Sequence, residues 1–191
     1  MLAYVFWHWR SPTVEKTDYQ KRIIDFQETL GTHKPGGFRY STVFEIEHAP
    51  WSEGVGEVYE EWYVLDNSAA LDALNEAAVT GPCKEPHNRV ARDAAGGIAG
   101  LYGLYAGTSG LATARVARWF SKPSGMTYEN FHGILQPEVQ QAAGTLWQRQ
   151  MTLGPTPEFR WHSLQDHSLP EIFVCLKVPL TQIWSGLERT P

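Results

Sequence analysis

The alternation of hydrophobic and polar positions predicts the same order of elements twice along the chain. In the first half, a strand, a helix and two more strands are predicted in turn over 3–9, 17–30, 38–46 and 57–65. The second half repeats that order over 115–120, 127–143, 146–153 and 158–162. The strand predictions rest on alternating aromatic and β-branched residues, and the helix predictions on apolar residues three and four positions apart. We therefore expect two copies of one structural unit.

The two copies are predicted to end differently. The first copy continues with helices over 68–79 and 86–95 and with a Gly- and Tyr-rich strand over 101–106. The second copy shows one further strand over 172–178 and no second helix, with at most one turn over 183–187. The second copy is therefore expected to be truncated or remodelled.

The order strand, helix, strand, strand, helix, strand is the ferredoxin-like order. Its tandem duplication resembles the dimeric α/β-barrel superfamily and looks most similar to an uncharacterised bacterial family with two tandem repeats. The resemblance implies an α+β fold in which two tandem ferredoxin-like repeats, the second truncated, form an α/β-barrel-like antiparallel sheet assembly. We place the repeats at 1–108 and 111–191, with a linker at 108–110. The superfamily includes metal-free monooxygenases, heme-binding and chlorite-dismutating proteins, stress-response proteins and isomerases, so the fold alone does not decide the function.

The composition indicates a folded protein with a sizeable core, because 42% of the residues are hydrophobic and 19% are charged. Eight tryptophans suit a core, an interface or the wall of a pocket. The net charge of −5 argues against a nucleic-acid partner, and no apolar stretch reaches the ~18 residues that a membrane span needs. The short apolar start lacks the basic leader and cleavage site of a signal peptide, so we expect a cytoplasmic protein.

One face of the first predicted sheet gathers the candidate functional residues. In the first strand, alternation separates a wholly apolar set from a mixed set that includes Tyr4, Phe6 and His8. The apolar set is Ala3, Val5, Trp7 and Trp9. We expect the apolar set to pack against the helices. The mixed set is expected to line a pocket on the opposite face, in the interior of the barrel.

Three polar residues are the catalytic candidates in this pocket. His8 is the predicted general base, because imidazole exchanges protons near neutral pH. Arg39 is the predicted partner of an anion or oxyanion, and Glu45 lies on the same predicted face. Either Glu60 or Glu61 is expected to join them, since adjacent strand residues point to opposite faces. Tyr4, Phe6 and Trp62 are predicted to form the walls of the pocket. The second repeat offers further polar candidates for it, which are Arg115 or Arg118, Gln148 or Arg149, and Arg160 or His162.

No cofactor is predicted, and heme is the alternative. Superfamily members that bind heme use a helical histidine, and the resemblance makes His87 and His132 the candidates, with Arg89 and Arg92 beside the heme propionates. Two groups of residues have spacings that resemble a zinc site, Cys83 with His87 and His162 with Asp166 and His167. Both are weak zinc signals, so no metal is predicted.

From these observations we predict a homodimeric protein that binds a small hydrophobic or aromatic molecule. We expect it to act on that molecule without a cofactor, in the manner of a monooxygenase or an isomerase. The alternative is a non-enzymatic ligand-binding, stress-related or oligomerisation protein. An enzyme predicts an enclosed cavity in which His8, Arg39 and Glu45 converge. An interaction protein predicts that the same side chains pack across a subunit boundary without a void.

Overall fold

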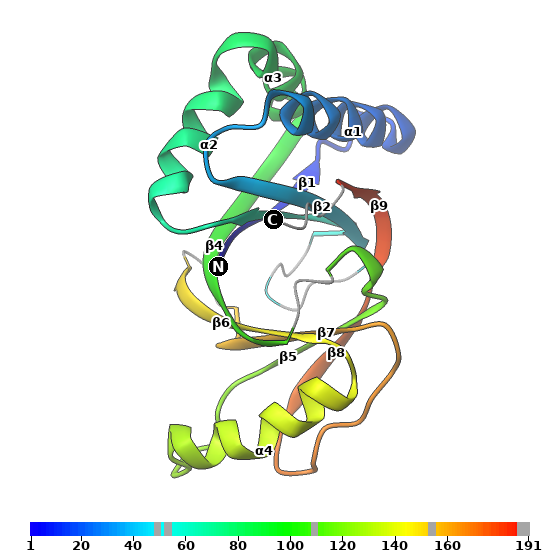
Figure 1. Cartoon of the computed structure of the whole chain (residues 1–191). Coiled ribbons are helices and arrows are strands. Elements are labelled where there is room, and N and C mark those ends of the chain that lie inside the picture. The colour runs from blue at the N-terminus through cyan, green and yellow to red at the C-terminus, as the bar shows by residue number, and fades with distance from the viewer. Residues whose placement is uncertain (48–50, 52–54, 108–110, 153–155, 187–191) are drawn as a thin grey trace.

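The computed structural model describes residues 1–47, 51, 55–107, 111–152 and 156–186. This part of the chain holds four α-helices and nine strands, together with two short 3₁₀ turns (Figure 1). In chain order they are β1 (Leu2–Arg10), α1 (Lys16–His33), β2 (Phe38–Ile46), β3 (Val58–Leu65), α2 (Ala69–Val79), α3 (Lys84–Asp93), β4 (Ala94–Gly107), β5 (Val116–Phe120), α4 (Tyr128–Gln141), β6 (Thr145–Thr152), β7 (Phe159–Ser163), β8 (Cys175–Pro179) and β9 (Thr181–Ser185). None of the described helices is both long and apolar enough to cross a membrane.

The nine strands form one antiparallel sheet in the order β8-β5-β7-β6-β4-β1-β3-β2-β9. Within it, β4-β1-β3-β2 and β8-β5-β7-β6 have the same internal order, which is that of a ferredoxin-like sheet. The fold is therefore α+β, with two tandem ferredoxin-like repeats, and the described residues of the second repeat contain no second helix. This confirms the predicted fold class. The boundaries of the repeats stay a prediction, and the predicted linker at 108–110 lies outside the described residues.

The stretch that contains β8 and β9 closes the sheet into a barrel. β8 pairs with β5 at one end of the strand order, and β9 pairs with β2 at the other. Between them, the Leu180 amide donates to the Arg115 carbonyl oxygen at 3.0 Å. The sequence predicted at most one turn where β9 lies, and this was wrong. β9 forms because β2 offers it an open edge, and that edge lies far away in the sequence, where a local pattern does not reveal it.

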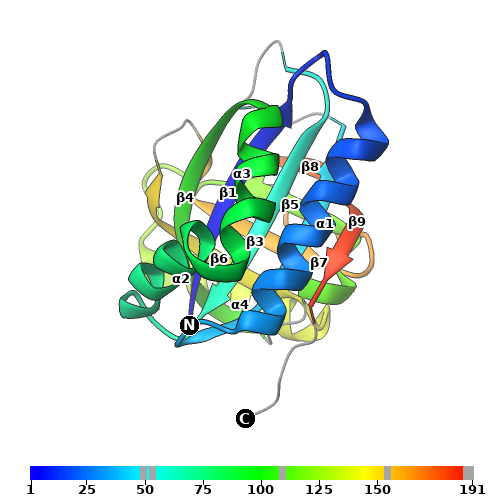
Figure 2. The ribbon, with the colours of Figure 1, turned by 90° about the horizontal axis from the view of Figure 1, so that it is seen from above.

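Helices cover the barrel on two sides (Figures 1 and 2). α1, α2 and α3 lie over one side and α4 lies over the other, so the barrel interior, the layer under α1–α3 and the layer under α4 form three separate cores. The interior is filled by large buried rings, which include Trp7, Trp62, Trp119, Trp147, Tyr102 and Phe44.

The first strand faces the opposite way from the prediction. Ala3, Val5 and Trp7 point into the barrel interior, whereas Tyr4 packs with the core under α1–α3. Alternation separates the two faces of a strand but does not say which face meets the helices. These three apolar side chains occupy the interior because a closed barrel has to be filled by side chains without voids.

Candidate functional site

A cavity of about 530 Å³ lies between the sheet and the helices α2 and α3, outside the barrel interior. Its floor is formed by Tyr4, Phe6, His8, Glu61 and Tyr63 of β1 and β3. Its roof is largely apolar and includes Leu71, Leu74, Val90 and, among polar side chains, His87. This volume is in the range of small-molecule sites. We call it the His8 cavity.

Strand register brings the floor residues together. Tyr4 pairs with Tyr63 and Phe6 pairs with Glu61 across β1 and β3, and His8 follows two positions later on the same face. The predicted grouping of Tyr4, Phe6 and His8 on one face is thus confirmed. That face lies under the helices, which corrects the prediction of a pocket in the barrel interior.

His8 and Glu61 are the buried polar pair of the floor. His8 has no exposed surface and Glu61 is 3% exposed. His8 Nε2 lies 3.2 Å from Glu61 Oε1, but the two are not aligned as a hydrogen bond, and neither atom has another hydrogen-bond partner. Buried polar atoms usually have such a partner, so these two atoms are exceptional on the floor of a cavity.

The other atoms of this pair are held by two tyrosines, and a glutamine supports one of them. His8 Nδ1 lies 2.6 Å from the Tyr19 hydroxyl oxygen. The Tyr63 hydroxyl donates to Glu61 Oε2, and Gln27 Nε2 donates to the Tyr63 hydroxyl oxygen at 2.9 Å. The pair is therefore fixed from both ends by buried hydrogen bonds, which leave His8 Nε2 and Glu61 Oε1 facing each other.

Burial controls the protonation of the tyrosines around the pair. Burial first, and then the Glu61 carboxylate, raise the pKa of Tyr19 and the pKa of Tyr63 well above the ordinary value of a phenol. Both hydroxyls therefore keep their protons at neutral pH.

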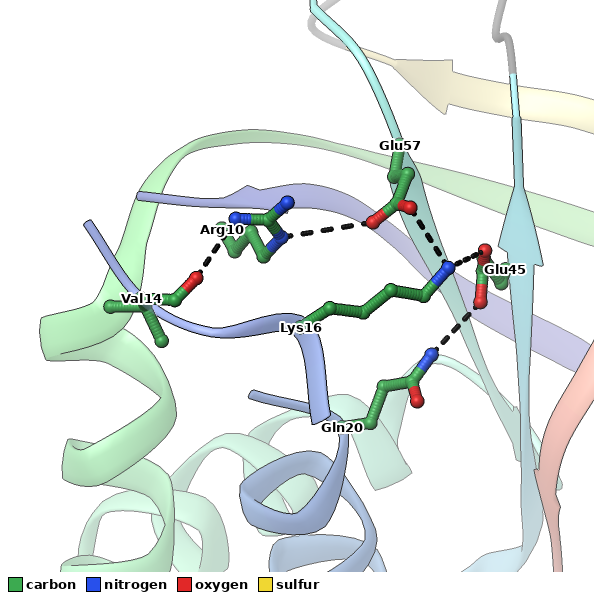
Figure 3. A network of polar contacts seen from close by, with 6 residues as sticks. All are labelled: Arg10, Val14, Lys16, Gln20, Glu45 and Glu57. Carbon is green, nitrogen blue, oxygen red and sulfur yellow. Dashed lines mark hydrogen bonds and ion pairs between the residues drawn. The ribbon is translucent and has the colours of Figure 1, made fainter. Parts of the chain in front are cut away.

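Glu45 lies outside the His8 cavity, in a polar cluster at the start of α1 (Figure 3). Lys16 Nζ donates to Glu45 Oε1 at 2.5 Å and to Glu57 Oε1 at 2.8 Å, and Gln20 Nε2 donates to Glu45 Oε2 at 2.8 Å. These hydrogen bonds raise the pKa of Lys16. Arg10 joins the cluster through a 3.7 Å contact between its Nε and Glu57 Oε2. Glu45 is thus engaged in tying α1 to β2 and β3.

Arg39 and Trp62 also lie away from the His8 cavity. Arg39 Nε donates to Asp66 Oδ1 at 2.6 Å beside a different, more open groove. The Trp62 indole donates to Glu60 Oε1 at 2.6 Å inside the barrel. The structure thus keeps His8 with Tyr4 and Phe6, and it does not bring Arg39, Glu45 or Trp62 to them.

Glu60 and Glu61 point to opposite faces of β3, as predicted. Glu60 forms an ion pair with Arg160 inside the barrel, where the Trp7 indole also donates to it at 2.7 Å. The Arg160 guanidinium lies over the rings of Trp62 and Trp119, at 4.8 and 4.5 Å from their centroids. Glu60 therefore belongs to the barrel core, and Glu61 is the carboxylate of the His8 cavity.

The heme candidates lie on different helices. His87 is half-buried in the roof of the His8 cavity, while His132 of α4 stacks on Tyr105 at 3.9 Å. Arg89 and Arg92, expected beside propionates, are paired with Asp25 and Glu85. Both ion pairs are between exposed side chains, which bind each other weakly, so heme binding stays a prediction.

The metal candidates do not converge. Among the residues that the structure describes, no group of three or more His, Cys, Asp or Glu side chains is placed to hold a metal ion. His162 is buried in the barrel, whereas Asp166 pairs with Arg118 and Lys177.

Sequence reasoning missed three of the residues that build this site, Tyr19, Gln27 and Tyr63. Tyr19 lies on the buried stripe of α1, and Gln27 lies two turns later on the same face. A polar head group on a buried helical stripe needs a hydrogen-bond partner. That requirement was the available signal for a polar network under α1.

Comparisons with known proteins identify the fold. No protein-family profile matches the chain, and no curated protein matches it either. Two solved structures of provisionally assigned monooxygenases are similar over nearly their whole length. One, from Lactobacillus acidophilus NCFM, is 10% identical to this chain with a TM-score of 0.64. The match covers 98% of this chain and 96% of the Lactobacillus chain. The other, from Fusobacterium nucleatum subsp. nucleatum ATCC 25586, is 8% identical with a TM-score of 0.66. That match covers 100% of this chain and 97% of the Fusobacterium chain.

An anthrone oxidase-like protein is also similar, at 8% identity and a TM-score of 0.52, over 94% of this chain and 91% of its own. The chain has the fold of these α/β barrels. At such low identities the likeness shows the shared fold and leaves the activity of this chain to be argued from its own site.

Proposed function

We propose that this chain binds a small, flat, uncharged molecule in the His8 cavity and removes a proton from it. The observation that carries the proposal is the His8–Glu61 pair. Its two facing atoms are buried, lie 3.2 Å apart and have no hydrogen-bond partner at the floor of an apolar cavity. Histidine beside a carboxylate in such a place suits general acid–base catalysis.

The lining of the cavity supports the proposed ligand class. Phe6 and Tyr4 offer flat surfaces on the floor, and the roof is mostly aliphatic. The charged side chains that line it are carboxylates, Glu61 and Asp72, and no lysine or arginine contributes to this lining within the described ranges. An anionic ligand would meet like charge there, which disfavours it.

Oxidation by dioxygen is the reaction proposed to follow proton removal. Loss of a proton from an activated methylene leaves a carbanion, which dioxygen oxidises as a C–O bond forms. Cleavage of the O–O bond then releases water, so one anthrone and one dioxygen give one anthraquinone and one water. The fold shared with provisionally assigned monooxygenases and an anthrone oxidase-like protein supports this reaction over an isomerisation, in which the proton would return to the ligand.

Anthrone is the probe that tests the proposal. The purified protein is expected to consume dioxygen and form anthraquinone, and turnover is expected to fall by about 100-fold or more in both His8→Ala and Glu61→Gln. His33→Ala serves as the control, because His33 lies exposed at the end of α1. Turnover that stays at the wild-type rate in both cavity variants would refute the proposal.

A further inference from the structure

The Tyr19 hydroxyl has one described hydrogen-bond partner, His8 Nδ1, at 2.6 Å. Tyr19 is fully buried, and its other ring neighbour, Tyr59, meets it edge-on at 5.3 Å between centroids. A hydroxyl proton buried in this position has to point at an acceptor, because an unpaired buried donor is costly.

The direction of this hydrogen bond sets the tautomer of His8. Burial and the nearby Glu61 carboxylate raise the pKa of Tyr19, so its oxygen keeps the proton and donates it to Nδ1. A ring nitrogen that accepts a hydrogen bond carries no proton, so the ring proton of His8 is then on Nε2. The reverse tautomer would leave the Tyr19 proton without a described acceptor.

Nε2 is the atom of His8 that faces Glu61 Oε1 at 3.2 Å. A proton on Nε2 makes this contact attractive, whereas a lone pair there would face the negative carboxylate. Nδ1, the basic nitrogen of this tautomer, is already occupied by Tyr19. The carboxylate oxygen at the cavity floor that has no hydrogen-bond partner is Glu61 Oε1, and a carboxylate is a stronger base than a phenolic hydroxyl.

We infer that Tyr19 is a positioning residue that holds His8 as the Nε2–H tautomer, so that Glu61 takes the proton from the ligand and His8 donates a hydrogen bond to the resulting anion. This inference rests on the proposed function. In the proton-removal step, the C–H bond of the ligand breaks, its proton goes to Glu61 Oε1 and its electron pair stays on the ligand. The Nε2–H of His8 stabilises the negative charge that develops on the ligand oxygen.

Two substitutions at His8 separate the donor role from the base role. His8→Gln keeps an N–H donor but has no basic nitrogen, so we expect its anthrone turnover to stay within about tenfold of wild type. His8→Ala and Glu61→Gln are expected to lose about 100-fold or more. If His8→Gln is as inactive as His8→Ala while wild type is active, His8 is the base and the inference is wrong.

The tautomer is measured directly by ¹⁵N NMR of the histidine side chains, with the His8 signals assigned by their loss in His8→Gln. Wild type is expected to show a protonated Nε2 and an unprotonated Nδ1, and Tyr19→Phe is expected to shift both signals toward a mixture. Tyr59→Phe is the matched control, since Tyr59 stacks on His8 at 5.7 Å without a hydrogen bond to it and should leave the tautomer unchanged.

The two failures are distinguishable. A protonated Nδ1 in an active wild-type protein, or unchanged His8 signals in Tyr19→Phe, would refute the role of Tyr19 and leave the proposed function standing. A protonated Nε2 in a protein that removes no proton from anthrone would refute the proposed function, and with it the role of Glu61.

Discussion

Two neighbouring glutamates of β3 show how strongly the position of a residue decides its chemistry. Glu60 faces the barrel interior, where Arg160 and two indoles satisfy both of its oxygens. Glu61 faces the helices, where Tyr63 satisfies one oxygen and the other stays free beside His8. The first carboxylate is saturated and structural, and the second has the free acceptor capacity that a general base needs.

His162 gives a prediction about pH. Burial first, and then the neighbouring Arg160, hold the pKa of His162 well below its ordinary value of 6.5. The unfolded chain then binds a proton near pH 6.5 that the folded chain does not bind, so the free energy of unfolding falls as the pH drops below that value. We expect a slope approaching about 1.4 kcal/mol per pH unit from this residue.

Urea denaturation at pH 5 and pH 7 measures the effect, with His162→Leu as the comparison. The variant is expected to lose less stability between the two pH values than wild type. An identical loss in both proteins would show that His162 does not carry the pH dependence.

At the scale of the element, the fold could be predicted further than the site. The order of β1, α1, β2 and β3 followed from periodicity, because each is long enough to show its spacing. The face that meets the helices did not follow, since both faces of β1 carry aromatic residues and either could be buried. β9 was missed because the open edge of β2 lies far away in sequence and is invisible to a local pattern.

Only part of the candidate site could be predicted, because alternation along a strand gives the face of a side chain and not its distance from other side chains. Alternation placed His8, Glu45 and Arg39 on one face, but it says nothing of distance across or along a sheet. Glu45 lies opposite Tyr59, which itself lies opposite His8, so two strand spacings separate the two side chains. Arg39 lies near the other end of β2, beside Asp66.

The connection from α4 to β6 gives a prediction about packing. A Cβ atom on Gly144 would lie 2.4 Å from the His162 carbonyl oxygen and 2.5 Å from Trp161 Nε1. Because the first of these neighbours is backbone and cannot move aside, Gly144→Ala is expected to lower the free energy of unfolding by about 1–3 kcal/mol.

Gly133 is the matched control for Gly144. It lies exposed inside α4, and a Cβ atom there would meet nothing within 4 Å. Gly133→Ala is therefore expected to raise the free energy of unfolding by up to about 1 kcal/mol, through helix propensity. Urea denaturation of both variants checks the pair, and changes of the same sign would contradict the packing argument.

At the scale of the whole molecule, one buried ion pair joins the two repeats. Glu60 comes from β3 of the first repeat and Arg160 from β7 of the second, and both side chains are fully buried. Removing one partner leaves the other charge uncompensated, so Arg160→Met is expected to cost about 3–5 kcal/mol of unfolding free energy. The double variant Glu60→Gln with Arg160→Met is expected to recover part of that loss.

Arg118→Met provides the comparison, because the Arg118 partner Asp166 is half-exposed and stays hydrated when the arginine is lost. It is expected to destabilise the protein less than Arg160→Met does. Equal losses in the two single variants, measured by urea denaturation, would show that burial of the Glu60–Arg160 pair does not set its cost.

The strands that close the barrel have a consequence for the order in which the protein is made. β8 and β9 leave the ribosome after every strand that they join, and the Thr42 hydroxyl that donates to the Trp184 carbonyl oxygen lies 142 positions earlier in the chain. Until that last stretch has been synthesised, β2 and β5 each present an unpaired edge on which another nascent chain could add a strand. Such distant pairing also forms slowly. The newly made protein is therefore exposed to aggregation during this interval, and a chaperone that shields the open edges of β2 and β5 would protect it.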